Sequence, residues 1–448
     1  MMTTRYQNKR ILIIGLGISG RSAARFLLQK GAGLIGVDRN LNELDGHVEI
    51  QSLEKAGMEI HHDQTEIDFS QIELVILSPG ISALHPLVQQ AVHINIEVIG
   101  EIELGCRHVQ SPVLGITGTN GKTTVTLLVQ HVLTFCGFSS QALGNVGTPF
   151  TQEIDQNALN LDAIVLELSS YQLETMEQKV LDAGLILNIT PDHLDRYKNM
   201  FNYAKAKARL GNCLKLEKPL FIEYQTWQDF SGLFEEFCVE TYGYTRHSMI
   251  YSDLRHVYFR DKKVFELPEN LQGQPSHDLE NLMGAYGLCT TKGISGTQFI
   301  EAFKSFKKPP HRIQFVRNFR GVDYYDDSKG TNIEAVIRAV QSLKGPIILI
   351  AGGLDKGASY QPWISQFKDK VKNILVIGQA SNRIQQDLNH HMPVEILESL
   401  ESAVSRAAQL AKNGDSVLLS PGCASQDMFK DYIHRGEVFQ QVVKSLAH

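Results

Sequence analysis

The sequence predicts an α/β protein with parallel sheets and about three domains. It has 448 residues, and one domain usually takes roughly 150 residues. Short β-rich apolar runs alternate with amphipathic helical stretches, which is typical of βαβ units with buried parallel strands. Many runs end in small or turn residues, and loops at that end of parallel strands are where open α/β sheets bind ligands. The runs are Ile11–Ile14, Leu74–Leu77, Val113–Ile116, Ala163–Leu166, Leu185–Ile189, Ile347–Ile350, Ile374–Ile377 and Ser416–Leu419.

Two domain boundaries follow from the order of these elements. A new strand–loop–helix unit begins after Gly100, and two prolines follow a helical stretch at 307–310. We therefore predict domains at 1–100, 101–310 and 311–448. Segment 218–275, rich in tyrosine, phenylalanine and charged residues, is consistent with a small β-meander on the central domain.

Composition excludes several classes of protein. Lysine and arginine total 43 and aspartate and glutamate total 49, so the formal net charge is −6. A chain with this net negative charge has no overall positive charge that would attract nucleic acid, so we expect no nucleic acid binding. The apolar runs are far shorter than the ~20 residues that span a bilayer, which predicts no membrane insertion. The six cysteines are scattered without a CxxC pair, and a reducing cytoplasm is their simplest setting.

The first glycine loop, Gly15–Gly20 (GLGISG), follows a predicted strand and opens a helix, and Asp38 ends the next strand. This matches the dinucleotide fingerprint of Rossmann-like domains, in which backbone N–H groups and a helix N-terminus face a pyrophosphate. Three interpretations stay open: an NAD-dependent dehydrogenase, another nucleotide or pyrophosphate site, and a βα turn whose glycines serve packing.

The second glycine loop, within residues 113–124, is more specific. An apolar strand runs into the turn 118–121, and Lys122-Thr123-Thr124 opens a helix. In such loops backbone N–H groups cradle phosphates, the lysine reaches the β/γ oxygens and the hydroxyl binds Mg²⁺. Ile116 stands where the strict pattern has glycine, so the loop is a variant. It predicts ATP binding, which a dehydrogenase does not need.

Four further polar clusters follow predicted strands. Glu167 ends the run Ala163–Leu166, and a carboxylate there can hold Mg²⁺ beside Thr123. The others are 192–196 (DHLDR), 326–332 (DDSKGTN) and 420–427 (SPGCASQD), of which we expect the last to open the final helix. Each has a plain structural alternative: a solvated glutamate, a helix cap or a polar turn.

Together these motifs resemble the Mur ligases, the ATP-dependent amide-forming enzymes of peptidoglycan precursor synthesis. GTNGKT, ELSSYQLE, NITPDHLDR, DDSKGTN and SPGCAS occur in the family's order across essentially the whole chain. GLGISG, SPG at 78–80 and GNVG at 144–147 point within the family to members that add D-glutamate.

The resemblance implies three domains: an N-terminal Rossmann-like domain for the UDP moiety, a central P-loop ATPase-like domain with a parallel sheet, and a C-terminal Rossmann-like domain for the amino acid. The implied reaction joins D-glutamate to UDP-N-acetylmuramoyl-L-alanine through an acyl phosphate, in the cytoplasm. ATP and two Mg²⁺ ions are the implied cofactors. We expect small-molecule substrates only and a monomeric enzyme.

Matched residue by residue, the family pattern assigns the site. Its UDP-sugar residues are Ile18, Ser19, Asp38, Arg39, Ser78, Gly80, Asn145, Ser169 and Gln172. Its ATP residues are Gly118, Thr119, Asn120, Gly121, Lys122, Thr123, Thr124, Asn281, Arg312 and Asp327. Its D-glutamate residues are Lys329, Thr331, Lys356, Ser425 and Tyr432. Its catalytic residues are Lys122, Glu167, His193 and Lys207, and its metal ligands are Thr123, Glu167, His193 and Lys207 as a carbamate.

Lys207 shows how far the resemblance goes beyond the residues themselves. Its sequence context alone indicates a solvated helical lysine. In the family a lysine at this spacing is carbamylated, which turns a cation into an anionic oxygen ligand, and Lys205 fits that spacing less well. Two positions depart from relatives: Asp278 stands where asparagine is frequent, and Tyr432 where phenylalanine is common.

Rival interpretations remain at this point. They are another Mur ligase or a folylpolyglutamate synthetase relative, a Rossmann dehydrogenase, and a nucleotide-sensing module without turnover. The GLGISG loop argues against the folate enzymes, which begin directly with the ATP-binding domain.

Overall fold

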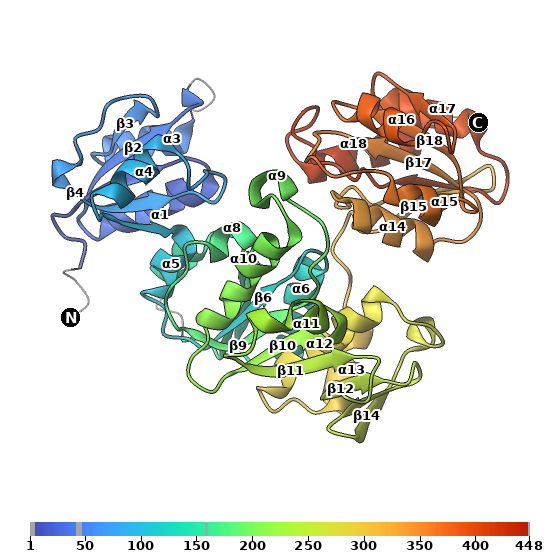
Figure 1. The fold of residues 1–448 in the computed structure, drawn as a ribbon, viewed down its shortest axis with the longest axis horizontal. Helices are drawn as coiled ribbons and strands as arrows, with labels where there is room; N and C mark the ends of the chain where they lie inside the picture. Colours follow the sequence, from blue (N-terminus) through green and yellow to red (C-terminus); the bar gives the residue numbers. More distant parts are fainter. Residues whose placement is uncertain (1–4, 42–46, 157–159, 447–448) are drawn as a thin grey trace. The chain divides into compact units, whose positions relative to one another are not determined.

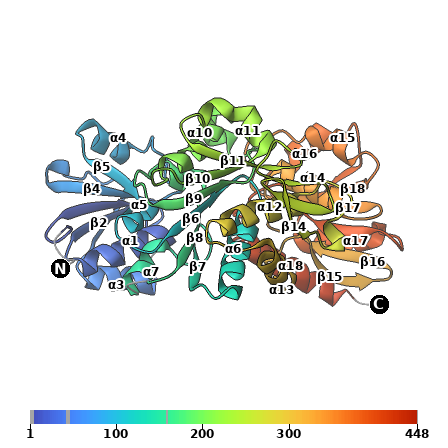
Figure 2. The ribbon, with the colours of Figure 1, turned by 90° about the horizontal axis from the view of Figure 1, so that it is seen from below.

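The computed structural model describes residues 5–41, 47–156 and 160–446 and confirms the α/β class. The chain divides into two compact units, Met1–Asn188 with Ala204–Phe306, and Ile189–Tyr203 with Lys307–His448. The first unit holds two sheets and the second unit one (Figures 1 and 2). Within the described ranges, no helix is long and apolar enough to cross a membrane.

The N-terminal sheet has five parallel strands in the order β3-β2-β1-β4-β5. Alternate residues of β1 enter two different cores: Ile11 and Ile13 join the cluster on one face, and Leu12 and Ile14 join that on the other. This two-residue period explains the uninterrupted apolar run. The strands are β1 (Arg10–Ile14), β2 (Gly33–Asp38), β3 (Glu59–His62), β4 (Ile72–Leu77) and β5 (Glu97–Gly100). The helices are α1 (Ile18–Gln29), α3 (Val48–Lys55), α4 (Pro86–His93) and α5 (Glu101–Cys106).

The second sheet has nine strands in the order β14-β13-β12-β11-β10-β9-β6-β8-β7. Its strands are β6 (Val113–Thr117), β7 (Ser140–Gly144), β8 (Ala163–Glu167), β9 (Leu181–Ile186), β10 (Pro219–Glu223), β11 (Cys238–Gly243), β12 (Ile250–Ser252), β13 (His256–Phe259) and β14 (Lys262–Glu266). Its helices are α6 (Lys122–Phe135), α7 (Phe150–Gln156), α8 (Ser170–Leu173), α10 (Met200–Asn212), α11 (Tyr224–Phe230), α12 (His277–Thr290) and α13 (Gly296–Ser305).

Two sequence predictions need correction here. The strand expected at Leu185–Ile189 is β9, which begins earlier, at Leu181, and ends at Ile186. Its beginning was not predicted because Asp182 interrupts the apolar pattern. The Asp182 carboxylate accepts from the Val113 N–H at 3.0 Å. The predicted meander is right only for β12–β14, which pair antiparallel. The strands β10 and β11 instead pair parallel as part of the main sheet.

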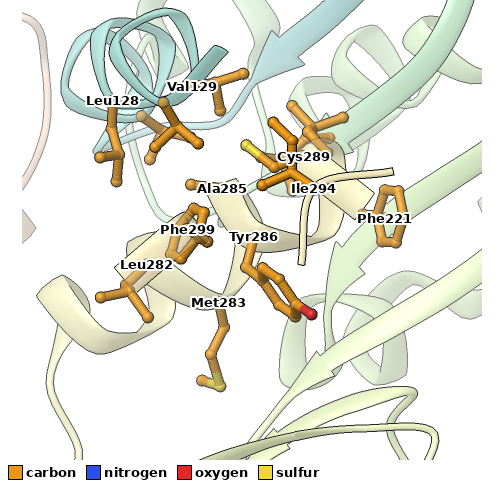
Figure 3. Packing of buried hydrophobic residues seen from close by; sticks show 14 of the residues in the cluster. Leu128, Val129, Phe221, Leu282, Met283, Ala285, Tyr286, Cys289, Ile294 and Phe299 are labelled. Atoms are coloured by element: carbon orange, nitrogen blue, oxygen red, sulfur yellow. The ribbon is translucent and has the colours of Figure 1, made fainter. Parts of the chain in front are cut away.

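Helices cover both faces of the nine-stranded sheet. On one face α6 packs against α12, and Figure 3 shows Leu128, Ala285 and Phe221 within the same buried cluster. On the other face α10 lies close to the strands, because a side chain at Gly115 of β6 would meet Leu210 at 3.2 Å. This close packing holds the end of β6, and so the second glycine loop, against α10.

The second unit carries a six-stranded sheet in the order β15-β16-β20-β17-β18-β19, parallel except for β15. Its strands are β15 (Gln314–Phe319), β16 (Val322–Asp326), β17 (Ile347–Gly352), β18 (Val371–Ile377), β19 (Val394–Ile396) and β20 (Ser416–Leu419). Its helices are α9 (Leu194–Tyr197), α14 (Ile333–Ser342), α15 (Pro362–Phe367), α16 (Ser381–Leu388), α17 (Leu400–Leu410) and α18 (Tyr432–Ser445). The prediction that 420–427 opens the last helix is wrong: α18 begins at Tyr432, where the Asp431 side chain accepts from the His434 N–H.

A buried carboxylate, Glu101, joins α5 to α7 in the first unit. Its Oε1 accepts from the Thr151 backbone N–H at 2.6 Å and from the Thr151 hydroxyl at 2.8 Å. The Thr151 hydroxyl lies 2.8 Å from that of Ser22 on α1. Burial raises the pKa of Glu101 from 4.5 to about 7.

This raised pKa gives a prediction for stability. Between pH 4.5 and 7 the unfolded chain loses the Glu101 proton while the folded chain keeps it, so the free energy of unfolding falls as pH rises, by up to about 3 kcal/mol. We expect Glu101→Gln to flatten this part of the stability–pH curve measured by urea unfolding. The exposed Glu54→Gln is the matched control, and equal slopes in wild type and Glu101→Gln would contradict the account.

Candidate functional site

The first glycine loop joins β1 to α1. Gly15 has a φ of +90°, which favours glycine, and a side chain at Gly20 would meet the Gly15 carbonyl oxygen at 2.0 Å. The Ser78 hydroxyl donates to that same carbonyl at 2.7 Å from the end of β4. Ser78 therefore closes the loop from the neighbouring strand.

Asp38 supports this loop from the end of β2. Its carboxylate accepts from the Leu16 backbone N–H at 2.7 Å and from the Asn40 N–H at 2.9 Å. Arg39 is exposed and pairs with Asp63 at 3.1 Å. Ile18, at the start of α1 beside the loop, is 69% exposed.

The second glycine loop runs from β6 to α6. Its Gly118 and Gly121 have φ angles of +153° and +88°. Lys122 folds back over the loop, and its Nζ donates to the carbonyls of Gly118 at 2.8 Å and Thr119 at 2.9 Å. The ammonium group is thus held at the loop whose backbone N–H groups begin α6.

Two asparagines that are far away in sequence lie against this loop. The Asn188 Oδ1 accepts from the Asn120 N–H at 2.8 Å, and the Asn188 Nδ2 donates to the Asn120 carbonyl at 3.1 Å. A side chain at Gly121 would meet the Asn281 Oδ1 at 2.4 Å. The structure therefore places Asn281 against the loop. Asn188 lies inside the run Leu185–Ile189 and was not predicted as a site residue.

Glu167 and Asn145 meet at the ends of the paired strands β8 and β7. The Asn145 Nδ2 donates to the Glu167 Oε1 at 2.8 Å. Glu167 is 1% exposed, and its Oε2 has no hydrogen-bond partner among the described residues. A buried carboxylate oxygen without a partner is costly and is available to a cation.

Lys207 lies on α10 and is 1% exposed, not solvated as its sequence context alone indicated. Its Nζ donates to the Gly118 carbonyl at 2.7 Å. The side chain therefore contacts the second glycine loop from α10, while Lys205 on the same helix is exposed.

The remaining predicted residues of the first unit have local roles. Ser169 caps α8, and its hydroxyl and N–H both reach the Gln172 Oε1 in a capping box. Thr123 and Thr124 are buried in the first turn of α6. Asp278 lies in the first turn of α12, a favourable place for a negative charge. Gly80 is exposed in the turn after β4.

Three loops meet at the carboxyl ends of the strands in the second unit. The Gly422 N–H donates to the Gly330 carbonyl at 2.8 Å, joining 326–332 to 420–425. Leu354 and Ala424 exchange backbone hydrogen bonds, joining 420–425 to the loop after β17. Lys329, Thr331, Lys356 and Ser425 lie on these three loops.

Arg435 of α18 fixes two of these loops and was missed by the sequence analysis. It is 1% exposed and donates to the Ser328 carbonyl at 2.8 Å and to the Cys423 carbonyl at 3.3 Å. Burial lowers the pKa of its guanidinium to about 10. No sequence signal distinguished it from the other arginines.

The cations of this unit already have partners. The Lys329 Nζ lies 3.9 Å from the centre of the Tyr432 ring. The tyrosine at position 432, where phenylalanine is common, therefore makes a cation–π contact with Lys329. The Lys356 Nζ lies 3.4 Å from the Asp192 Oδ1, and the Asn332 Nδ2 donates to the Asp192 Oδ2 at 3.3 Å. Asp192 thus anchors the segment that carries His193 within the second unit.

Asp327 is buried beside Arg312. Its Oδ2 accepts from the Ser420 hydroxyl at 2.7 Å and its Oδ1 from the Ile313 N–H at 3.3 Å. Burial raises the pKa of Asp327 to about 7, and the nearby charge of Arg312 opposes that rise. Asp327 therefore keeps its proton to a higher pH than an ordinary aspartate does.

These features describe a glycine loop held by Lys122 and by the buried Lys207, with the buried carboxylate Glu167 in the same unit, and a second unit with cationic loops. Among the described residues, no three His, Cys, Asp or Glu side chains form a metal cluster. Mg²⁺ needs no such cluster, because it commonly uses one or two carboxylates together with waters and substrate phosphates.

Family models cover most of the chain. Residues 9–100 match the Mur ligase MurD-like N-terminal domain, residues 116–289 the Mur ligase middle domain, and residues 311–423 the Mur ligase glutamate ligase domain. A protein from Protochlamydia amoebophila named UDP-N-acetylmuramoylalanine–D-glutamate ligase is 52% identical over 449 residues, covering 100% of both chains. The chain belongs to the Mur ligase family.

Other Mur ligases are also similar to this chain. A protein of the same name from Caldanaerobacter subterraneus is 38% identical, covering 98% of this Mur ligase and 99% of that chain. MurF from Thermotoga maritima, solved in complex with ADP, has a TM-score of 0.62 at 15% identity and covers 93% of this chain and 96% of its own. MurC from the same organism has a TM-score of 0.61 at 17% identity, covering 97% and 99%. These two structures confirm the fold.

Proposed function

We infer that this Mur ligase uses ATP to join D-glutamate to UDP-N-acetylmuramoyl-L-alanine in the synthesis of peptidoglycan precursors. The observation that carries this inference is the 52% identity with a relative of that name along the whole of both chains. The Lys122 loop supports the use of ATP, since its ammonium and backbone N–H groups suit phosphate oxygens.

The reaction would run in two steps. The carboxylate oxygen of the first substrate attacks the γ-phosphorus of ATP, and the bond to the bridging oxygen of ADP breaks, giving an acyl phosphate. The amine of D-glutamate then attacks the acyl carbon, loses a proton, and phosphate leaves. The protein contributes by positioning reactants and offsetting charge on the transferring phosphoryl group.

For the nucleotide we propose Gly118–Thr124 with Asn281 in the first unit, and Arg312 with Asp327 in the second. The support is the hydrogen bonding of this loop by Asn188 and the close approach of Asn281 to Gly121. A loop held rigid in advance loses little entropy when phosphate binds.

We propose that Mg²⁺ binds at Thr123 and Glu167, with His193 and a carbamylated Lys207 as ligands of two ions. Among the described residues the Glu167 Oε2 has no hydrogen-bond partner, which supports this fit. When bound, the ions supply charge neutralisation for phosphoryl transfer. Glu167 would be held in place by Asn145, whose amide occupies the other carboxylate oxygen.

The two organic substrates would take separate places. We propose Ile18, Ser19, Asp38, Arg39, Ser78, Gly80, Asn145, Ser169 and Gln172 for the UDP-sugar. We propose Lys329, Thr331, Lys356, Ser425 and Tyr432 for D-glutamate, because two ammonium groups and hydroxyls suit its two carboxylates. Domains at 1–100, 101–310 and 311–448, a monomeric state, a cytoplasmic location and independence from nucleic acid and membrane stay predictions.

The buried Lys207 gives a test of the carbamate. We expect Lys207→Ala to lose most activity, because an oxygen ligand is removed, and short-chain carboxylates added to the assay to restore part of it by entering the space. Lys205→Ala on the exposed side of α10 should retain wild-type turnover. Loss of activity in Lys207→Ala that no carboxylate restores would contradict carbamylation.

The proposed reaction is tested by phosphate release from ATP with Mg²⁺ and UDP-N-acetylmuramoyl-L-alanine. D-glutamate, L-glutamate, meso-diaminopimelate, L-lysine and no amino acid are compared. We expect release with D-glutamate only. Release with a different amino acid would support the ligase activity but contradict D-glutamate as the substrate. No release from folded protein would contradict both the activity and the substrate.

A further inference from the structure

A cavity in the first unit contains none of the residues assigned above. Its volume is about 620 Å³, within the range of small-molecule sites. Its lining comes from α11, β11, the segment between β11 and β12, and the β13–β14 turn. The residues that matter here are Tyr224, Trp227, Glu240, Arg246, Ser248 and Arg260.

Two aromatic rings form one wall of the cavity. Tyr224 and Trp227 lie about one turn apart on α11, with ring centres 5.9 Å apart and planes inclined at 43°. Both are half-buried, so part of each ring remains accessible. Aromatic side chains of this kind stack with nucleobases of any identity.

Two arginines line the same cavity. Among the described residues, neither Arg246 nor Arg260 forms an ion pair within 4 Å, although Arg260 packs over the Phe259 ring. Guanidinium groups bind phosphate through paired hydrogen bonds. Two carboxylates also line the cavity, Glu240 and Asp261, and Asp261 accepts from the Tyr251 hydroxyl at 3.3 Å. Burial raises the pKa of Glu240, and the nearby charge of Arg260 opposes that rise.

An unsatisfied hydroxyl points independently to a ligand. Ser248 lines the cavity and is 4% exposed, and its Oγ has no hydrogen-bond partner among the described residues. Buried hydroxyls are nearly always paired. A phosphate or ribose oxygen would supply the missing partner.

We propose that this cavity is a second nucleotide site, which takes a nucleoside monophosphate. The base stacks on Tyr224 and Trp227, the phosphate binds Arg246 and Arg260, and the Ser248 hydroxyl pairs with the ligand. Neither glycine loop contributes a residue to this site, so its occupancy is separate from turnover.

Tryptophan fluorescence reports on this site alone. The chain has two tryptophans, and Trp363 is fully buried in the second unit. The probe is UMP, added to the full-length protein with saturating UDP-N-acetylmuramoyl-L-alanine, and radiolabelled UMP is measured in parallel by equilibrium dialysis. We expect one equivalent of UMP to bind and to quench Trp227 saturably, at least tenfold more tightly than uridine or inorganic phosphate.

Variants then locate the binding. We expect Arg246→Ala and Arg260→Ala each to weaken UMP binding at least tenfold with turnover unchanged. We expect Trp227→Phe to lose the fluorescence signal while dialysis still detects bound UMP. The exposed Lys262→Ala of the β13–β14 hairpin should bind like wild type. No UMP bound in dialysis, or wild-type affinity in both arginine variants, would overturn the proposal. Phosphate binding as tightly as UMP would overturn the nucleotide assignment.

Discussion

Lys122→Ala is expected to reduce kcat by at least about 10²-fold, because a preorganised donor to a transferring phosphoryl group is worth that much. The Lys122 Nζ sits on the carbonyls of Gly118 and Thr119, at the loop that would hold the β- and γ-phosphates. Binding of UDP-N-acetylmuramoyl-L-alanine should be unchanged, since its proposed residues lie elsewhere.

The measurement pairs steady-state phosphate release with calorimetric titration of the UDP-sugar. The matched control is Lys198→Ala, which removes an exposed lysine of the second unit. Turnover of Lys122→Ala close to wild type would contradict the phosphate role of the loop. Loss of UDP-sugar binding together with turnover would indicate misfolding, which circular dichroism checks.

Glu167→Gln is expected to lower kcat by about 10²- to 10³-fold, since a lost metal contact costs several kcal/mol of transition-state stabilisation. Glutamine keeps the size of the side chain and can still accept from Asn145, but its amide nitrogen replaces the Oε2, which has no hydrogen-bond partner among the described residues. We expect the Mg²⁺ concentration for half-maximal activity to rise as well.

A Mg²⁺ titration of turnover distinguishes this role from a purely structural one. Asn145→Ala should give a milder loss, because it leaves both carboxylate oxygens in place and removes only the group that orients them. An unchanged Mg²⁺ dependence in Glu167→Gln would refute the metal role of this residue, whatever the change in kcat.

Local patterns could be predicted from the sequence because they depend on neighbouring residues. Both glycine loops lie between a strand and a helix as predicted, and their Gly15 and Gly121 adopt φ values that favour glycine. Glu167 ends a strand as predicted, because its apolar run fixes a buried parallel strand.

Long-range contacts could not be predicted in this way. The pairing of Asn188 with Asn120 and the burial of Lys207 under Gly118 depend on how strands and helices pack. Nothing local to Lys207 separates it from Lys205. Arg435 is similar: its guanidinium binds carbonyl groups of two loops more than ten residues away in sequence.

The boundaries that failed have physical causes. A polar residue inside β9, Asp182, hid the beginning of that strand. The segment 420–427 was expected to open a helix, but its backbone pairs with neighbouring loops instead, through Gly422 and Ala424. Those pairings join the segment that carries Ser425 to the loop after β17, which carries Lys356.

Oxygen tracing tests the central claim most directly. UDP-N-acetylmuramoyl-L-alanine labelled with ¹⁸O in its alanine carboxylate is turned over with ATP, Mg²⁺ and D-glutamate, and the released phosphate is analysed by mass spectrometry. The account predicts ADP as the nucleotide product and one carboxylate oxygen in each phosphate, because the oxygen that attacks the γ-phosphorus leaves with it. Unlabelled phosphate, or AMP with pyrophosphate, would contradict activation of the carboxylate as an acyl phosphate.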